Sequence, residues 1–281
     1  MKTIEINDVK FNVPTSYNEL NGKALEMISK LHVGQNPVTQ FNALFYLLGL
    51  KWWKISDLKK WKIVYQLPAE WIHTLLVDKS LFGWIWDKSK LTTYKLSKFR
   101  LGFVMYYGPK KNVLNMNAIE ITSCYELFKL YAETKNLKFL DMLIAIIYRE
   151  KNWFWWIKRW KYGFDGDVRV PLSEYGVTKR TEKFKKLAEW KKVLIFLQFA
   201  GKWEEFENLE RNKLIFPKFD MVNANKKHDP DAWKKIMMKM AESNVFGTLS
   251  EVEKTDKDRF FLNMVRAVEE YLAIKDKTPK K

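Results

Sequence analysis

Cysteine and histidine are scarce in this sequence of 281 residues. Because Cys124 is the only cysteine, an intramolecular disulfide and a cysteine-rich metal site are both excluded, which fits a reducing compartment. The three histidines, His32, His73 and His228, lack the i, i+4 spacing that places two imidazoles on one metal ion. We therefore expect no structural metal.

Motifs of catalysis are also missing. The chain has only 11 glycines, and neither a G-x-x-x-x-G-K-[ST] nor a G-x-G-x-x-G motif offers a backbone cradle for phosphates. Cys124 falls in the apolar stripe of a predicted helix, so we expect a buried core thiol and not a nucleophile. The run Asp165-Gly166-Asp167 lacks the further oxygen ligands of a calcium loop and is interpreted as a solvated turn. These absences predict a protein that is not an enzyme and needs no cofactor.

Long apolar runs are absent as well. The most apolar stretches, residues 41–50 and 140–148, are far shorter than the roughly 20 residues that cross a bilayer. Residues 1–13 alternate between polar and apolar side chains, which is unlike a signal or transit peptide. We predict no transmembrane segment.

Basic and aromatic residues are abundant. The formal net charge is +17, the sequence pI is about 9.6, and aromatic residues, including 13 tryptophans, make up 16% of the chain. Such a charge favours nucleic acid, anionic lipid or an acidic protein surface as a partner. With 47% hydrophobic residues the chain also has enough apolar side chains for a sizeable core.

The first half of the chain predicts a hairpin followed by helices. Residues 3–13 alternate with period two across Asn7-Asp8, which tolerate the positive φ of a tight turn. The spacing of Ser16 and Glu19 predicts a capping box that starts one helix, and Asn36-Pro37 predicts the start of a second helix that ends near Gly49. Residues 51–111 are irregular and aromatic, with β-like pieces at 81–86 and 99–107.

Helical patterns dominate the second half. Ser123 and Glu126 have the spacing of another capping box, residues 137–147 continue the helical period, and residues 182–200 predict a long core helix that ends at Gly201. The polar run 223–228 is interpreted as a linker between a main domain, 1–222, and a separable helical unit, 229–274, followed by a disordered basic tail, 275–281. The predicted fold class is α+β, mainly α-helical, with an N-terminal β-hairpin and a short irregular β/aromatic region.

Aromatic and basic residues alternate in two segments, 51–62 and 153–161. On a helix, Trp153, Trp156 and Trp160 would share the core face at i, i+3 and i+7. This combination suits single-stranded nucleic acid, an anionic membrane interface or a protein interface; it also suits tryptophan core anchors in a chain where lysine is the default surface residue. The candidate partner-binding residues are Trp155, Phe154, Lys158, Arg159, Trp52, Trp53 and Lys54.

Several segments carry a resemblance to a known group of proteins. They are the opening hairpin with residues 13–20 (VPTSYNEL), residues 131–134 and 143–149, and residues 233–242 followed by 244–247. Together they resemble uncharacterised tail-region proteins of phages and prophages of Bacteroidetes hosts, which include tail assembly chaperone-like and small baseplate or virion proteins. The resemblance implies a non-enzymatic protein that binds other phage proteins, such as a tape-measure protein, in the host cytoplasm during assembly or in the virion. The alternative is a basic module of phage or host that binds single-stranded nucleic acid.

Overall fold

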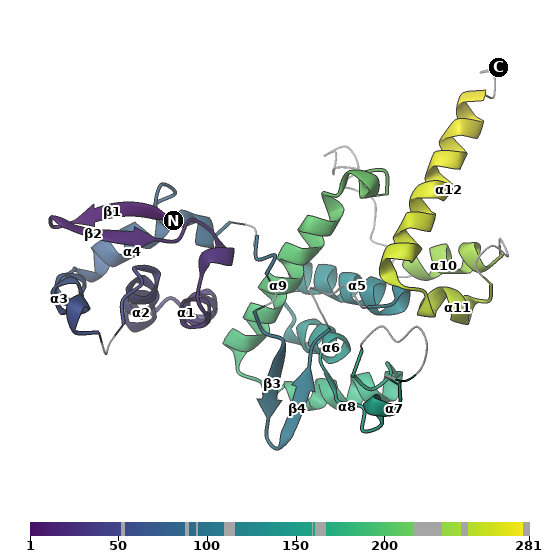
Figure 1. The fold of residues 1–281 in the computed structure, drawn as a ribbon, viewed down its shortest axis with the longest axis horizontal. Helices are drawn as coiled ribbons and strands as arrows, with labels where there is room; N and C mark the ends of the chain where they lie inside the picture. Colours follow the sequence, from purple (N-terminus) through teal and green to yellow (C-terminus); the bar gives the residue numbers. More distant parts are fainter. Residues whose placement is uncertain are drawn as a thin grey trace. The chain divides into compact units, whose positions relative to one another are not determined.

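The computed structural model describes residues 1–277 except 52–53, 88–89, 94, 110–115, 159, 161–166, 216–231 and 243–246 (Figure 1). The chain divides into two compact units. Unit 1 comprises residues 1–95 and 186–202, and unit 2 comprises residues 96–185 and 203–281. All three boundaries between the units, at 95/96, 185/186 and 202/203, fall inside the range 1–222 that is predicted to be one main domain. The predicted linker 223–228 lies outside the described residues.

Unit 1 begins with the predicted hairpin, which is confirmed. Strands β1 (Lys2–Ile6) and β2 (Val9–Val13) pair antiparallel, and Ile4 lies opposite Phe11. The turn residues Asn7 and Asp8 have φ values of 47° and 60°, as a tight turn with two left-handed residues requires. The hairpin turns Ile4 and Phe11 into the core.

Helices fill the rest of unit 1. Within residues 1–95 they are α1 (Gly22–Val33), α2 (Pro37–Leu47), α3 (Leu58–Tyr65) and α4 (Ala69–Val77), with the 3-10 turns η1 (Tyr17–Glu19), η2 (Ile55–Asp57) and η3 (Gly83–Ile85). Residues 189–202 of unit 1 belong to a longer helix that is described below. The predicted start of α2 is confirmed, because the Asn36 side chain accepts a hydrogen bond from the Thr39 backbone N–H and Pro37 takes the first helical position. Gly49 follows this helix with a φ of 72°.

Two predictions for unit 1 are wrong. Ser16 caps no α-helix: the Glu19 carboxylate accepts from the Thr15 N–H, and the backbone is extended again at Leu20. The cap of α1 is Asn21, whose side chain accepts from the Ala24 N–H. The β-like piece 81–86 is the 3-10 turn η3, in which Gly83 lies so close to the backbone of Val77 and Asp78 that a Cβ would collide.

Unit 2 is built around α5 (Ala118–Thr134), α6 (Leu137–Ile147) and α8 (Glu174–Phe184). Strands β3 (Lys98–Leu101), β4 (Val104–Tyr107) and β5 (Arg149–Glu150) form an antiparallel sheet in that order, so the predicted strand character of 99–107 is confirmed as a hairpin. One face of this sheet packs on α8, where the ring centroids of Tyr106 and Phe184 are 4.8 Å apart. A single helical turn, α7 (Trp155–Lys158), follows β5.

The helix starts predicted at Ser123 and Glu182 are wrong. Asn117 caps α5 through the Glu120 N–H, so Ser123 lies inside the helix. The predicted helix 182–200 is divided between the end of α8 and a separate helix, α9 (Glu189–Glu207). This helix continues past Gly201 to Glu207. Glycine is needed at position 201 because the helix lies against the Leu91 backbone there, and an added Cβ would lie 2.5 Å from the Leu91 oxygen.

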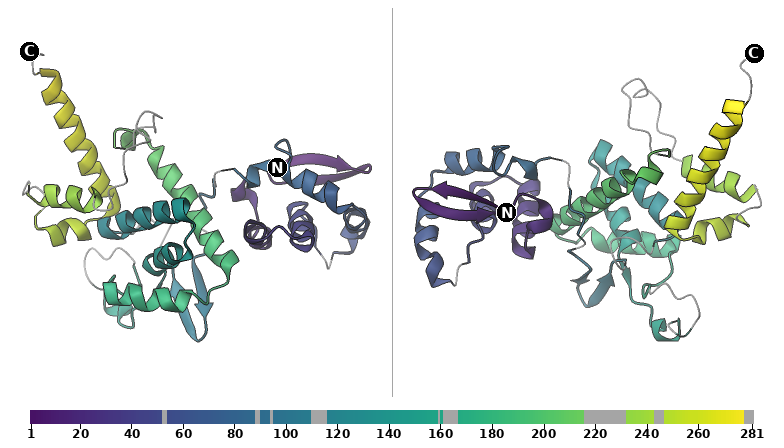
Figure 2. Two further views of the ribbon diagram at one scale, coloured as in Figure 1. Left: turned by 180° about the vertical axis from the view of Figure 1, so that it is seen from behind. Right: turned by 45° about the horizontal axis from the view of Figure 1, so that its top comes forward.

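The C-terminal helices are α10 (Ala232–Glu242), α11 (Leu249–Lys254) and α12 (Lys257–Lys277), preceded by the 3-10 turn η4 (Glu210–Asn212) (Figure 2). They belong to unit 2 and pack against α5. The Ala118 N–H donates to the Thr255 oxygen, and the Lys257 N–H donates to the Met116 oxygen. Because α12 extends to Lys277, it includes part of the segment 275–281 that was expected to be a disordered tail. Among all described residues, no helix has the length and hydropathy of a bilayer-spanning segment.

Candidate interaction surface

Two of the seven predicted partner-binding residues, Phe154 and Lys54, have described side chains, and they belong to different units. Phe154 is exposed and precedes α7, whereas Lys54 is exposed before η2 in unit 1. Trp155 and Lys158 belong to α7, but their side chains lie outside the described part of the chain. The residues Trp52, Trp53 and Arg159 lie outside it entirely.

The predicted core stripe of Trp153, Trp156 and Trp160 is wrong. These side chains are 85%, 54% and 87% exposed, respectively. The physical reason is the length of α7, whose four residues make little more than one turn and present no continuous face to a core. The sequence pattern identified the aromatic segment but wrongly assigned these three rings to the core, whereas Phe154 is exposed as predicted.

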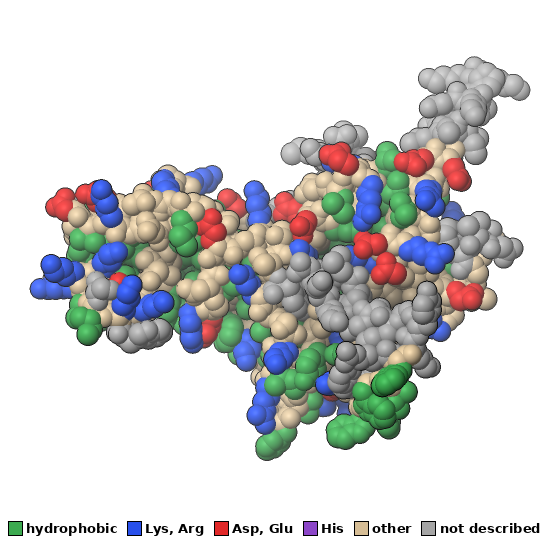
Figure 3. Space-filling model, in the orientation of Figure 1, with side chains coloured by type: hydrophobic (Ala, Val, Ile, Leu, Met, Phe, Trp, Pro, Cys, Tyr) green, Lys and Arg blue, Asp and Glu red, His purple; other side chains and the backbone are tan. Residues whose placement is uncertain are grey.

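Three of the exposed rings, Phe103, Trp153 and Trp156, line one hollow, and the sequence pattern did not mark Phe103 as exposed. Phe103 is 97% exposed at the tip of the β3–β4 hairpin, where Gly102 supplies the positive φ of 59° that opens the two-residue turn. We define the aromatic surface as Phe103, Trp153, Phe154, Trp156, Ile157 and Trp160, all from unit 2. Figure 3 shows hydrophobic side chains gathered over α7. The alternation in 99–107 with Gly102-Phe103 at its centre was the signal that could have located Phe103.

A hollow of about 620 Å³ lies between the two segments of this surface. Its wall on one side is β4 with the preceding turn, and on the other side the chain from β5 to α7. The lining residues are Phe103, Val104, Met105, Tyr107, Glu150, Lys151, Asn152, Trp153 and Trp156. The hollow is therefore mainly apolar and aromatic, with one carboxylate and one ammonium group on its rim.

Backbone pairing fixes the chain that carries the tryptophans. Glu150 in β5 lies opposite Tyr106 in β4, and on the other side the Val170 N–H donates to the Glu150 oxygen at 2.9 Å. The Asn152 N–H donates to the Val168 oxygen at 2.8 Å. The segment before α7 is thus paired with β4 up to Glu150 and bonded to residues 168–170 up to Asn152.

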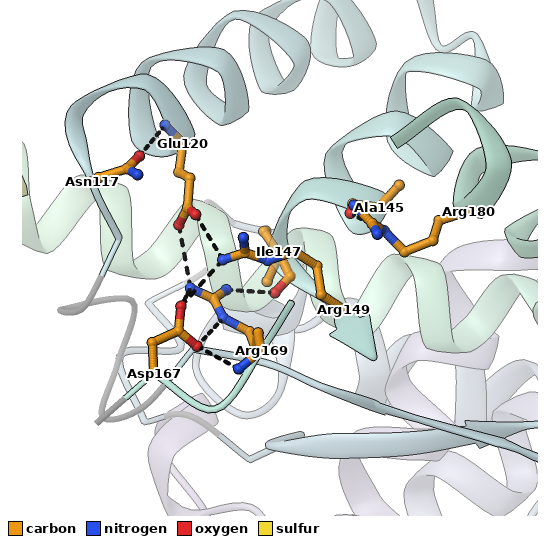
Figure 4. Close-up of polar contacts among 8 residues, drawn as sticks. All are labelled: Asn117, Glu120, Ala145, Ile147, Arg149, Asp167, Arg169 and Arg180. Carbon is orange, nitrogen blue, oxygen red and sulfur yellow. Dashed lines mark hydrogen bonds and ion pairs between the residues drawn. The ribbon is translucent and has the colours of Figure 1, made fainter. Parts of the chain in front are cut away.

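A buried cluster of four charges lies behind this segment (Figure 4). Glu120, on the first turn of α5, contacts Nη2 of Arg149 at 2.7 Å and Nη2 of Arg169 at 3.2 Å. Asp167 accepts from Nε of Arg169 at 2.8 Å and lies 3.3 Å from Arg149. Nη1 of Arg169 donates to the Ile147 oxygen at 2.8 Å, which ties the cluster to the end of α6.

The cluster balances two positive and two negative groups at low exposure to solvent. Burial raises the pKa of Glu120, although both guanidinium groups oppose this shift. Burial acts in the same direction on Asp167, but its hydrogen bonds to Arg169 outweigh burial and lower the Asp167 pKa. The prediction of a solvated turn at Asp165-Gly166-Asp167 is therefore wrong for Asp167. Residues 165 and 166 lie outside the described residues.

Cys124 lies one turn after Glu120 on α5 and is fully buried, so the prediction of a core thiol is confirmed. Burial raises the pKa of the thiol well above its usual range, which keeps it protonated and unreactive. Among the described residues, no group of three or more His, Cys, Asp and Glu side chains is placed to hold a metal ion.

Comparisons with known proteins found no counterpart for this arrangement. No protein-family model matches the chain, and neither a curated protein nor a solved structure is significantly similar to it.

Proposed function

We propose that the chain is a non-enzymatic assembly protein that docks another protein on the aromatic surface. The exposure of Phe103, Trp153 and Trp156 around one hollow carries this proposal, since folded monomers rarely leave several large apolar side chains in contact with water at one place. Tryptophan, phenylalanine and methionine are enriched at the centres of protein interfaces. These residue types make up most of the aromatic surface and four of the nine residues that line the hollow.

The hollow supports a protein partner over a phosphate backbone. Only two of its nine lining residues, Glu150 and Lys151, are charged, and Glu150 is paired with Arg180 at 3.3 Å. Val104, Met105 and Tyr107 offer an apolar floor that an aliphatic or aromatic side chain of a partner can fill. The backbone pairing of β5 and the buried charge cluster hold this floor in place, which lowers the entropy cost of docking.

The partner that we propose is another phage structural or assembly protein. This step rests on the resemblance of residues 13–20 and the other segments to tail-region proteins of phages. Docking would then take place in the host cytoplasm during tail assembly or in the virion, and an extended apolar segment of a tape-measure protein would suit the hollow.

Site-specific photo-cross-linking tests this proposal. A photoreactive phenylalanine analogue is placed at Trp153 in one variant and at Trp71 in a control, in cells where the phage assembles. Trp71 is a matched position because it is 64% exposed on α4 of unit 1 and lies outside the aromatic surface. We expect cross-links from position 153 to one protein, encoded by a phage structural or assembly gene, and none to that protein from position 71.

Two results would argue against the proposal. Cross-links from position 153 to nucleic acid or lipid would assign the surface to another class of partner. Equal cross-linking from positions 153 and 71 would mean that the aromatic surface has no special role.

A further inference from the structure

A second aromatic feature, on α3 of unit 1, is not used by the proposed function. The rings of Trp61 and Tyr65, one turn apart on this helix, stack with centroids 5.3 Å apart and an interplanar angle of 14°. Tyr65 is 67% exposed, and Phe41 of α2 supports it edge-on at 6.1 Å. The stacked pair is therefore a fixed, solvent-accessible aromatic face.

A small hollow adjoins this face. It measures about 230 Å³ and is lined by Lys51, Lys54, Asp57, Leu58 and Trp61. A ring forms part of its wall and two ammonium groups stand at its rim. This combination suits a flat, electron-rich ring that carries a negatively charged substituent.

The surroundings are strongly basic. Residues 51–65 contain five lysines and a single acidic residue, Asp57. Four of the lysines, Lys51, Lys54, Lys59 and Lys62, are exposed, and none of them forms an ion pair with another described residue. Four unneutralised ammonium groups next to a stacked aromatic pair attract a polyanion that has ring faces to offer.

We propose that this surface binds single-stranded nucleic acid. We name it the α3 platform and define it as Lys51, Lys54, Leu58, Trp61, Lys62 and Tyr65. One base stacks on the exposed face of Tyr65, a neighbouring base enters the hollow against Trp61, and the lysines contact phosphates. Because lysine binds phosphate as a point charge and every base has a π-face, binding is sequence-tolerant.

Two features favour nucleic acid over a lipid surface at this site. Trp61 is partly buried and stacked on Tyr65, whereas a tryptophan that anchors a protein in the headgroup layer has to protrude. The α3 helix is also held down on the hairpin, since Nζ of Lys60 lies 5.4 Å from the centroid of the Phe11 ring. The stacked rings of Trp61 and Tyr65 are therefore fixed on the surface of unit 1.

The test uses the purified protein of residues 1–281 and fluorescent 15-nucleotide dT and rU oligomers. Fluorescence anisotropy measures the binding affinity at several salt concentrations. We expect Tyr65→Ala to weaken binding on the order of tenfold, as the loss of one stacked base does. Tyr65→Phe keeps a ring and is expected to retain wild-type affinity. Trp71→Ala, which removes an exposed ring from a lysine-free helix of the same unit, should also bind as the wild type does.

The lysines are tested with charge-matched double variants. Lys51→Gln with Lys54→Gln is expected to weaken binding and to reduce the salt slope by about 1.4, because each phosphate contact on a single strand contributes roughly 0.7. Lys79→Gln with Lys186→Gln removes the same charge from exposed positions of unit 1 that do not line the hollow. This control is expected to have a clearly smaller effect.

Three results would overturn the proposal. They are no oligomer binding at low salt, equal affinity of Tyr65→Ala and the wild type, and equal losses in the two double-lysine variants. If the platform variants instead lose binding to vesicles of phosphatidylglycerol and keep binding to oligomers, the surface is a lipid site. Thermal denaturation of each variant separates loss of the platform from loss of the fold, and none of these outcomes bears on the aromatic surface of unit 2.

Discussion

Replacement of Arg169 by methionine is expected to lower the free energy of unfolding by about 3–5 kcal/mol. Arg169 is buried and is hydrogen-bonded to Asp167, Glu120 and the Ile147 oxygen. Its loss leaves two carboxylates with only Arg149 to neutralise them, and a buried charge without its partner is far more costly than the loss of an exposed pair. Urea unfolding of the variant and the wild type measures the difference.

Arg211→Met is the matched control. Arg211 also belongs to unit 2 and contacts Asp258 at 3.3 Å, but both side chains of this pair are exposed. Loss of an exposed pair is expected to cost less than about 1 kcal/mol. Similar losses for the two variants would mean that the buried cluster does not hold the segments around β5 together.

Phe261→Ala is expected to destabilise unit 2 as a whole by about 3–5 kcal/mol, the usual range for removal of a buried ring. Phe261 of α12 is 1% exposed, and its ring centroid lies 4.7 Å from that of Phe206 and 5.8 Å from that of Trp233. Trp233 in turn meets Tyr125 of α5 at 6.0 Å. This aromatic cluster links the C-terminal helices to α5, so loss of one ring should destabilise both α5 and the C-terminal helices.

Hydrogen exchange distinguishes this expectation from the sequence prediction of a separable helical unit at 229–274. If the helices are coupled, Phe261→Ala speeds exchange of α5 amides as well as those of α10 and α12. Faster exchange confined to α10–α12 would instead support the separable unit. Phe154→Ala removes the same side chain from an exposed position and should change stability by less than about 0.5 kcal/mol.

Short sequence patterns correctly predicted the secondary-structure elements that depend on neighbouring residues alone. The alternation around Asn7-Asp8 located the first hairpin, and Asn36-Pro37 located the start of α2. The serine capping boxes misled because the S-x-x-E spacing is only one of several ways to start a helix. Asn21 and Asn117, a few residues away in each case, supply the actual caps.

Features that depend on distant neighbours escaped the sequence patterns. Arg169 meets Glu120 across 49 residues and Arg149 meets Asp167 across 18 residues, and no short-range spacing marks such pairs. Gly201 was expected to end a helix, but contact with Leu91 explains why glycine stands there. The sequence predicted one of the two segments of the aromatic surface, because the tryptophans stand out in the composition. It did not predict the other, because Phe103 is brought close to the tryptophans only by the pairing of β4 with β5.

The docking role of the aromatic surface is tested most directly by the affinity for the partner that cross-linking identifies. The dissociation constant of this complex is measured for the wild type and for Trp156→Ala, at low and at high salt. Trp156 is the suitable ring because it belongs to the surface and also lines the hollow. We expect the variant to bind about 30-fold more weakly, which corresponds to about 2 kcal/mol, with little dependence on salt and with the stability of the fold unchanged. Trp71→Ala should bind as the wild type does. Docking of a protein on this surface would be contradicted if Trp156→Ala binds with unchanged affinity. It would also be contradicted if wild-type binding is lost as salt rises from about 50 to 200 mM, because such a loss is typical of phosphate contacts.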